Sequence, residues 1–415
     1  MGCTGETLLR FSSAENYRNM KIVIMQSRYG PYHIARLKAA RQYLAPHGLE
    51  ICGVQIASRD EYLWEEQRIV EDIPLVTVCE NASYQELSRK NIKNGTLAIL
   101  EHIQPHVIVT NGYIFPEAIV SIAWCRRNKK GVVVACDSKR NDAKRIWPRE
   151  FVKRIVVSAC DAAHVSGVLS EEYLMELGMN RERIFKGYDC VDNDFFGGIA
   201  SRKSEKKFDP KVAENLFISA SRFIRCKNIL CLLAAYKKYQ SAMGQDAWGL
   251  ILAGDGELAQ IIRKYIVDNQ IENIFLPGFV SSLELAKLFS SSACYIQTGV
   301  QETWGLVVNE AMACGLPLLL SNNIGCVPDL LEEGRNGLSF DPASVEDIAH
   351  AMLCMTNLSL EQRCQMGERS KEIIDLWSLE NFSRALYQAI ITAHEFSERR
   401  SRNWRPYNVV LRWLN

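Results

Sequence analysis

Short apolar runs rich in β-branched residues alternate with longer helical patterns along most of this chain, and the alternation restricts its possible folds. Residues 21–25 form one such run, and Gly30, Pro31 and a helical pattern at 33–44 follow it. Pro31 suits the first turn of a helix, where its missing N–H costs nothing. Strands that alternate with helices pair in parallel through crossover connections. We therefore predict an α/β fold built from doubly wound parallel sheets.

The alternation occurs in two blocks, which predicts two domains. A chain of 415 residues is too long for one ordinary core and fits two domains of about 150–200 residues each. The first block predicts strands at 21–25, 49–56, 107–110, 131–135, 163–165 and 183–185, with helices at 33–44, 84–103 and 116–127. The second predicts strands at 215–219, 249–253, 274–276, 293–297 and 316–321, with helices at 229–240, 258–268, 283–290 and from 307.

The predicted domain boundaries follow from a charged stretch rich in structure-breaking residues between the two blocks. We place an N-terminal acceptor-binding domain at 20–200, a linker at 201–214 and a C-terminal donor-binding domain at 215–385. Residues 386–415 are expected to cross back to the first domain, and residues 1–19 to be a disordered extension. Ligands bind beyond the carboxyl ends of parallel strands, so the site is expected in a cleft between two Rossmann-like domains.

Composition limits the partners of the chain. The formal net charge is +1, which gives no electrostatic case for nucleic acid. Fourteen cysteines occur singly, which favours reduced thiols in a cytoplasmic protein. No apolar run is long enough to predict a transmembrane helix. The basic and aromatic segment 398–414 is a candidate for peripheral membrane contact, and packing on the first domain is the alternative.

Two carboxylates surround the predicted start of a helix. Glu302 lies in the loop after the strand at 293–297, and Glu310 lies about one turn into the helix. N–H groups at a helix start bind phosphate oxygens, and carboxylates accept hydrogen bonds from pairs of sugar hydroxyls. The pattern predicts a ligand with phosphate in the middle and a polyol on each side, which describes a nucleotide sugar.

Two cations, Arg222 and Lys227, follow the first strand of the second block. Both are expected at the carboxyl end of that strand. Cations in this position would balance a diphosphate and stabilise it as a leaving group. A solvated basic loop without a ligand is the alternative.

Taken together, these motifs resemble those of the large retaining glycosyltransferase family 4, whose members have the GT-B fold. That family carries E-x7-E within the pattern E-x-F-G-x-x-x-x-E-A-M-A-x-G-x-P. This chain reads Glu302-Thr-Trp-Gly and then Glu310-Ala-Met-Ala-Cys-Gly-Leu-Pro317. Arg222 and Lys227-Asn228 match the family's R…K-N, and Pro277-Gly-Phe-Val280 matches its base-holding loop. Segments 325–329 and 333–337 resemble its G-x-x-E and D-G-x-x-G.

The resemblance implies a retaining transfer from a nucleoside-diphosphate sugar to an acceptor hydroxyl, with no cofactor and no metal. Arg222 and Lys227 would hold the diphosphate, Glu302 the sugar hydroxyls and Glu310 the ribose hydroxyls. The base would lie against Phe279 and Val280. The implied donor-binding residues also include the segment Thr303, Trp304, Gly305 and Leu306.

The first block departs from the family pattern at two places. The family often has a pair of glycines in the first loop, and here only Gly30 allows close approach to the donor. Asp137 occupies the place of a His that usually lies near the reacting carbon. Asp137 would bind a donor hydroxyl, act as base for the acceptor or cap the following segment. Acceptor-side candidates at strand ends are Asn111, Tyr113, Lys139 and Arg140.

Three other functions are weighed against a glycosyltransferase. The first is a dehydrogenase, because the segment 254–259 fits the dinucleotide-binding pattern G-x-G-x-x-A. However, this segment follows the second strand of its block, whereas the dinucleotide-binding pattern follows the first. We interpret it as a tight strand–helix turn. The remaining alternatives are a catalytically inactive nucleotide-sugar-binding protein and a GT-B epimerase.

Overall fold

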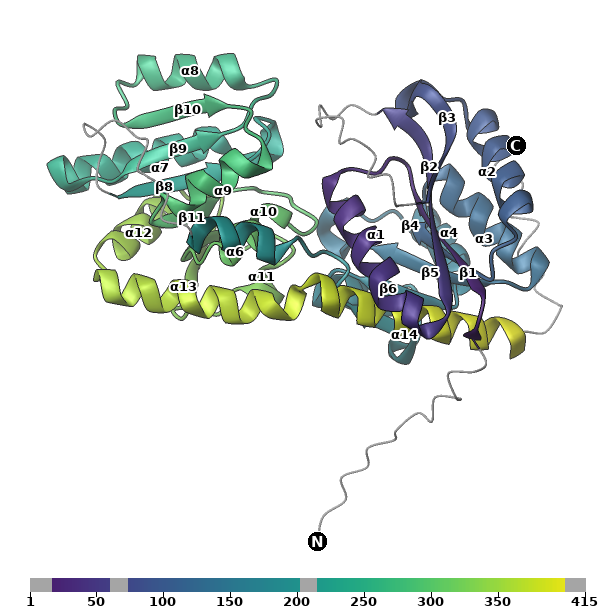
Figure 1. Cartoon of the computed structure of the whole chain (residues 1–415). Coiled ribbons are helices and arrows are strands. Elements are labelled where there is room, and N and C mark those ends of the chain that lie inside the picture. Colours follow the sequence, from purple (N-terminus) through teal and green to yellow (C-terminus); the bar gives the residue numbers. More distant parts are fainter. Residues whose placement is uncertain (1–16, 60–73, 202–214, 400–415) are drawn as a thin grey trace, which may run out of the picture. The chain divides into compact units, whose positions relative to one another are not determined.

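The computed structural model describes residues 17–59, 74–201 and 215–399, which form two parallel sheets with attached helices (Figure 1). The strand order is β3-β2-β1-β4-β5-β6-β7 in the first sheet and β10-β9-β8-β11-β12-β13 in the second. Strand pairs described in both sheets are parallel. Each order reverses direction beside its first strand, as in a doubly wound sheet. The predicted fold class of two Rossmann-like sheets is confirmed.

The strands are short and are connected mostly through helices. The first sheet contains β1 (Met20–Gln26), β2 (Leu49–Arg59), β3 (Leu75–Ser83), β4 (Val107–Asn111), β5 (Gly131–Cys136), β6 (Ala162–Val165) and β7 (Ile184–Lys186). The second contains β8 (Leu216–Ala220), β9 (Gly249–Ala253), β10 (Ile274–Gly278), β11 (Cys294–Gln297), β12 (Leu318–Ser321) and β13 (Gly337–Phe340).

The helices in the first half are α1 (Pro31–Leu44), α2 (Arg89–Ile103), α3 (Pro116–Asn128), α4 (Trp147–Ser158), α5 (Val168–Glu176) and α6 (Asn193–Ser201). Those in the second half are α7 (Ile229–Met243), α8 (Ala259–Asp268), α9 (Ser282–Ser290), α10 (Leu306–Ala313), α11 (Val327–Leu330), α12 (Val345–Thr356), α13 (Leu360–Ile374) and α14 (Leu379–Arg399). No helix among the described residues is both long enough and apolar enough to span a bilayer.

The chain packs into two compact units. Of the described residues, unit 1 contains 17–59, 74–133, 159–161 and 390–399, and unit 2 contains 134–158, 162–201 and 215–389. The division falls within β5, so the second sheet and the strands β6 and β7 belong to unit 2. The predicted linker lies almost entirely outside the described residues, as do the extension up to residue 16 and the C-terminal segment from residue 400. The domain boundaries stay predictions.

The prediction of one helix over 84–103 is wrong, because that stretch contains a break. Tyr84–Glu86 is a short 3₁₀ helix, and α2 begins only at Arg89. The Ser88 side chain accepts a hydrogen bond from the Asn91 N–H and so caps α2. Further elements with a weak or short apolar pattern were not predicted from the sequence: β3, β13, α4, α5 and α6.

The core of the second sheet fixes the positions of its loops. Phe217 on β8, Leu250 on β9 and Ile296 on β11 are fully buried. They belong to one cluster with Leu232 and Tyr236 of α7. Burial of side chains of this size contributes roughly 1.5–3 kcal/mol each, which holds neighbouring strand ends in register.

The turn after β9 brings two glycines against the loop after β8. Gly254 has φ +143° and Gly256 has φ +153°, which L side chains rarely adopt. A Cβ on Gly254 would lie 1.9 Å from the carbonyl oxygen of Ser221. Close backbone packing therefore explains both glycines of the G-x-G-x-x-A segment.

Replacing Gly254 with alanine should lower the free energy of unfolding by roughly 1–3 kcal/mol or more, because it adds backbone strain and a backbone clash. Urea unfolding followed by circular dichroism measures the change. Gly198→Ala in α6 is the matched control, because a Cβ there meets nothing within 4 Å. The control should be neutral or slightly stabilising. Equal midpoints for Gly254→Ala and the parent would contradict this interpretation.

Candidate functional site

An ion pair joins the loops that follow β8 and β11 in unit 2. Lys227, at the end of the 3₁₀ helix Arg225–Lys227, contacts Glu302 through its ammonium group. The side chains are only 15% and 18% exposed. The amide of Gln297 donates a second hydrogen bond to the same Glu302 oxygen, at 3.1 Å. The carboxylate is therefore held in one orientation by two side chains.

Backbone contacts hold the same two loops together. The Val300 N–H donates to the Cys226 carbonyl at 2.9 Å. The Thr298 hydroxyl donates to the Lys227 carbonyl at 3.2 Å. Lys227 and Glu302 are thus placed by their main chains as well as by their charges. The structure thus brings Lys227 and Glu302, two of the predicted site residues, into contact at this sheet edge.

The start of α10 lies directly after Glu302. Gly305 has φ +105° and is the N-cap residue, so a glycine is required where the chain turns into the helix. The Trp304 indole is buried and donates to the Asn309 side chain at 2.9 Å. The Asn309 amide donates to the Asp189 carbonyl at 3.0 Å. The Trp304 side chain therefore anchors the helix start.

A second loop, after β12, lies directly against the segment 302–304. The Gly325 N–H donates to the Glu302 carbonyl at 3.2 Å, and the Cys326 N–H donates to the Trp304 carbonyl at 3.1 Å. A Cβ on Gly325 would lie 1.7 Å from the Thr303 carbonyl oxygen. Only glycine permits this approach. It explains the first glycine of the 325–329 motif.

Asp329, the last residue of the segment 325–329, caps another helix of unit 2. Its carboxylate accepts a hydrogen bond from the Val168 N–H, the first residue of α5, at 2.9 Å. A negative charge at a helix N-terminus is stabilising. A Cβ on the preceding Gly167 would lie 2.2 Å from that carboxylate, so glycine is needed here too.

Asp137 lies at the end of β5 and reaches the segment after β11. The Thr303 side chain forms a hydrogen bond with it. Burial and, to a smaller extent, the charge of Asp189 raise the pKa of Asp137 from 3.8 to about 6, against the opposing effect of the Thr303 hydrogen bond. Asp189 is itself buried and accepts a hydrogen bond from the Ser166 hydroxyl at 2.6 Å. Asp137 therefore lies beside the predicted donor segment, as expected for a residue near the reacting atoms.

The polar residues after Asp137 separate in space. Lys139 is buried, and its ammonium donates to the Asn323 carbonyl at 2.6 Å. Burial lowers the pKa of Lys139. The amide of Gln301 donates to the Asp142 carbonyl. Arg140 is exposed and pairs with Glu176 at 2.5 Å, so it does not join these contacts.

The remaining residues predicted to bind the donor are Glu310, Arg222, Phe279 and Val280. Glu310 is in α10 with 1% of its surface exposed. Arg222 is exposed in the loop after β8. Phe279 follows β10 and is 60% exposed, and Val280 is half-buried beside it. The contacts with a base, a ribose or a diphosphate stay predictions.

The residues predicted in the first block that belong to unit 1 are Gly30, Asn111 and Tyr113. Gly30 is the N-cap of α1 in an extended conformation, and its N–H donates to His33 Nδ1 at 3.2 Å. Asn111 and Tyr113 are buried. Their predicted role on the acceptor side stays a prediction.

Two buried carboxylates, Glu117 and Asp189, were not predicted from the sequence. Glu117, in the first turn of α3, accepts hydrogen bonds from the side chains of Ser27, Tyr84 and Asn111 at 2.7–2.8 Å. Asp189 follows β7. The available signal for Glu117 was an acid directly after Pro116 in a helix that follows a buried strand. No signal marked Asp189, because β7 is only three residues long.

No group of three or more His, Cys, Asp or Glu side chains within the described ranges is placed to hold a metal ion. The absence of a metal requirement stays a prediction.

Comparison with known proteins connects this site to a family. Residues 201–373 match the family model described as Glycosyl transferases group 1, which covers all strands of the second sheet. The N-acetyl-alpha-D-glucosaminyl L-malate synthase of Bacillus anthracis is 24% identical over 188 residues, 45% of this chain and 48% of that protein. The chain spans about half the length of the curated relatives it matches. The predicted resemblance to glycosyltransferases is confirmed for this stretch.

Solved structures share the fold over most of the chain. A glycosyltransferase from Rickettsia africae has a TM-score of 0.70 and 14% identity, covering 93% of this chain and all of that one. The Anabaena protein Alr3699/HepE in complex with UDP and glucose has a TM-score of 0.67 and 16% identity, covering 89% and 98%. The predicted GT-B fold is thereby confirmed.

Replacing Asp137 with asparagine should change how stability depends on pH. Below pH 3.8 the carboxyl group is protonated in both the folded and unfolded chains. Between 3.8 and about 6 the unfolded parent loses this proton while the folded parent keeps it, so the parent loses stability relative to the variant. The difference in unfolding free energy should grow by roughly 2–3 kcal/mol in favour of the variant and then level off.

Urea unfolding at a series of pH values measures this difference. Thr303→Val provides a second arm, because it removes a hydrogen bond that lowers the pKa of Asp137. When both proteins also carry Thr303→Val, the difference in unfolding free energy should keep growing to a higher pH. A difference that stays the same at every pH would overturn the assignment of a raised pKa.

Proposed function

We propose that the protein is a retaining glycosyltransferase of family 4 that moves a sugar from a nucleoside-diphosphate sugar to an acceptor hydroxyl. The observation that carries the proposal is the Lys227–Glu302 ion pair directly before α10, within the stretch that matches the Glycosyl transferases group 1 model. This arrangement puts a cation, a hydroxyl-binding carboxylate and a helix N-terminus together. A sugar diphosphate needs all three.

In the proposed complex, Lys227 and Arg222 hold the diphosphate. The Lys227 ammonium has three N–H donors, so it can keep Glu302 while it binds a phosphate oxygen. Glu302 accepts hydrogen bonds from sugar hydroxyls, for which the contacts with Lys227 and Gln297 already orient it. Glu310 accepts hydrogen bonds from the ribose, and the base lies against Phe279 and Val280.

The proposed reaction exchanges one bond at the anomeric carbon for another. The bond from that carbon to the diphosphate oxygen breaks, and both its electrons leave with the nucleoside diphosphate. The acceptor oxygen forms the new glycosidic bond on the same face, and its proton passes to the departing phosphate oxygen. Arg222 and Lys227 stabilise the negative charge that develops on the leaving group.

Asp137 has a positioning role in this proposal. It contacts Thr303 next to Glu302, so its carboxylate would accept a hydrogen bond from a hydroxyl of the donor sugar. With a pKa of about 6 the group is mostly ionised at neutral pH and becomes neutral in mild acid. Transfer should therefore decline below about pH 6 in the parent. This decline should be absent in Asp137→Asn, although that variant is slower at every pH.

The candidates for the acceptor side are Asn111, Tyr113, Lys139 and Arg140. Asn111 and Tyr113 of unit 1 are buried, and Lys139 and Arg140 are engaged with Asn323 and Glu176. The Anabaena protein Alr3699/HepE has been solved in complex with UDP and glucose, which makes UDP-glucose the first donor to test here.

Lys227→Ala and Glu310→Ala should each reduce turnover at least tenfold, because each removes a proposed donor contact. Turnover is measured as nucleoside diphosphate released in the presence of an acceptor, after a thermal-shift screen of UDP-, GDP-, ADP- and dTDP-sugars. Lys264→Ala, at an exposed position of α8, is the matched control for loss of a lysine.

The outcomes separate the alternatives. Near-parental rates in both site variants would reject the donor-site assignment. Donor binding without any turnover, over a broad set of acceptors, would favour an inactive nucleotide-sugar-binding protein. Conversion of the donor to its epimer without release of nucleoside diphosphate would favour an epimerase.

A further inference from the structure

The start of α4 displays large apolar side chains that nothing in the proposed reaction uses. Trp147 is 77% exposed, Phe151 is 52% exposed and Ile146, just before the helix, is 43% exposed. The Trp147 and Phe151 rings stack with their centroids 5.8 Å apart. They are four residues apart and so lie on one face of the helix. Large apolar side chains of a helix usually face the core of the protein.

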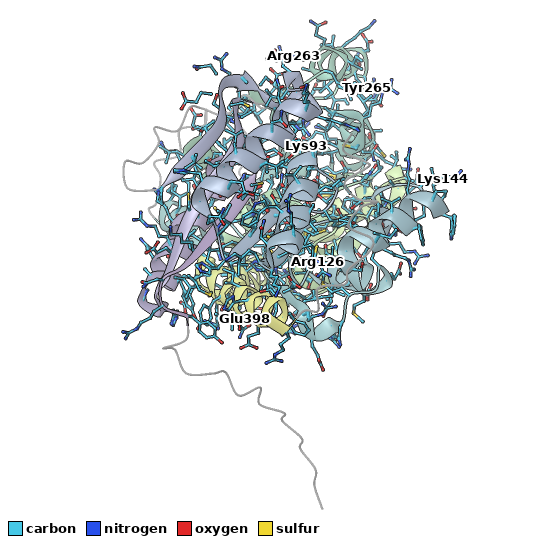
Figure 2. All side chains as sticks on the ribbon, turned by 90° about the vertical axis from the view of Figure 1, so that its right-hand side faces the viewer. Lys93, Arg126, Lys144, Arg263, Tyr265 and Glu398 are labelled. Carbon is cyan, nitrogen blue, oxygen red and sulfur yellow. The ribbon has the colours of Figure 1, made fainter. Side chains whose placement is uncertain are left out.

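Cations surround this apolar face. The segment 143–154 contains five basic residues and one acidic residue, whereas the whole chain has a net charge of only +1. Arg154 is exposed and lies seven residues after Trp147, on the same helical face. Lys144 is exposed just before the helix, and Figure 2 shows it at the margin of the molecule.

The carboxylate of Glu150, the one acidic residue of the segment, is engaged by contacts with neighbouring side chains. Glu150 accepts hydrogen bonds from Lys153 at 2.9 Å and from the Tyr173 hydroxyl at 2.8 Å. Arg145 also contacts Glu150, and its guanidinium lies 4.2 Å from the centre of the Tyr173 ring. This network anchors α4 to α5. It leaves Lys144, Trp147, Phe151 and Arg154 exposed to solvent.

We propose that Lys144, Ile146, Trp147, Phe151 and Arg154, here called the α4 patch, dock the protein on an anionic lipid surface. Exposed Trp and Phe side chains insert at the boundary between headgroups and acyl chains. Flanking Lys and Arg side chains bind anionic headgroups. The charge of the patch selects anionic lipid over a neutral one. This surface is distinct from the C-terminal segment 398–414 and does not depend on the proposed function.

The test is sedimentation of the full-length chain with lipid vesicles. The parent should bind vesicles of phosphatidylcholine mixed with phosphatidylglycerol, and bind vesicles of phosphatidylcholine alone at least about tenfold more weakly. The double variant Lys144→Glu/Arg154→Glu should reduce the partition coefficient at least about tenfold. Trp147→Ser/Phe151→Ser should reduce binding to the anionic vesicles similarly, because it removes the inserted apolar surface.

Two control variants make the test specific. Arg263→Glu reverses an exposed charge on α8, which Figure 2 also labels, and should bind as the parent does. Trp404→Ser/Trp413→Ser changes the C-terminal segment and should also bind as the parent does. The proposal is wrong if the parent binds neither kind of vesicle, binds both equally, or loses its binding through the C-terminal variant alone.

Discussion

The ion pair between Lys227 and Glu302 is the contact on which the arrangement of the candidate site depends. It joins the loop of the first strand of the second sheet to the loop of the fourth, and both side chains are largely withdrawn from solvent. Removing one partner of such a pair leaves the other charge partly desolvated and unpaired, which is costly. The pair therefore keeps the Glu302 carboxylate in one orientation, and a diphosphate bound as proposed would share the Lys227 ammonium with it.

Glycines make this arrangement possible because three loops approach their neighbours too closely for a side chain. Gly325 lies against the Thr303 carbonyl, Gly254 against the Ser221 carbonyl and Gly167 against the Asp329 carboxylate. In each case a Cβ would overlap the neighbouring atom. The same residue type that matched a family motif at 325 matched a dinucleotide motif at 254, where close packing explains it. A glycine pattern thus identifies a close approach first, and only its partner atoms show whether a ligand is involved.

The order of strands and helices, and the loops after β8 and β11, were predicted from the sequence more accurately than the polar contacts around those loops. Buried strands such as β9 have uninterrupted apolar runs, so their bounds were predicted correctly. β3 is only half-buried, and a 3₁₀ helix capped by Ser83 comes shortly before α2, so the two were predicted as one helix. Glu302 was placed correctly in a loop because its motif spacing is local.

Asp189 and Glu117 could not be found in the same way. Their carboxylates accept hydrogen bonds from residues distant in sequence, Ser166 to Asp189 and Ser27 to Glu117. A hydrogen bond between strand ends leaves no periodic trace, because only the fold brings the two partners together.

The α4 patch illustrates how an internal network determines what a helix offers to solvent. Glu150 would neutralise part of the patch if its carboxylate were free, but the carboxylate is engaged by Lys153 and by Tyr173 of α5. The outward face of α4 therefore combines aromatic rings with uncompensated positive charge. If the proposed transferase acts on an acceptor carried by a lipid, this face would concentrate the enzyme where that acceptor lies. Binding to vesicles and transfer to acceptors would then respond together to Arg154→Glu, whereas hydrolysis of a water-soluble donor would not change.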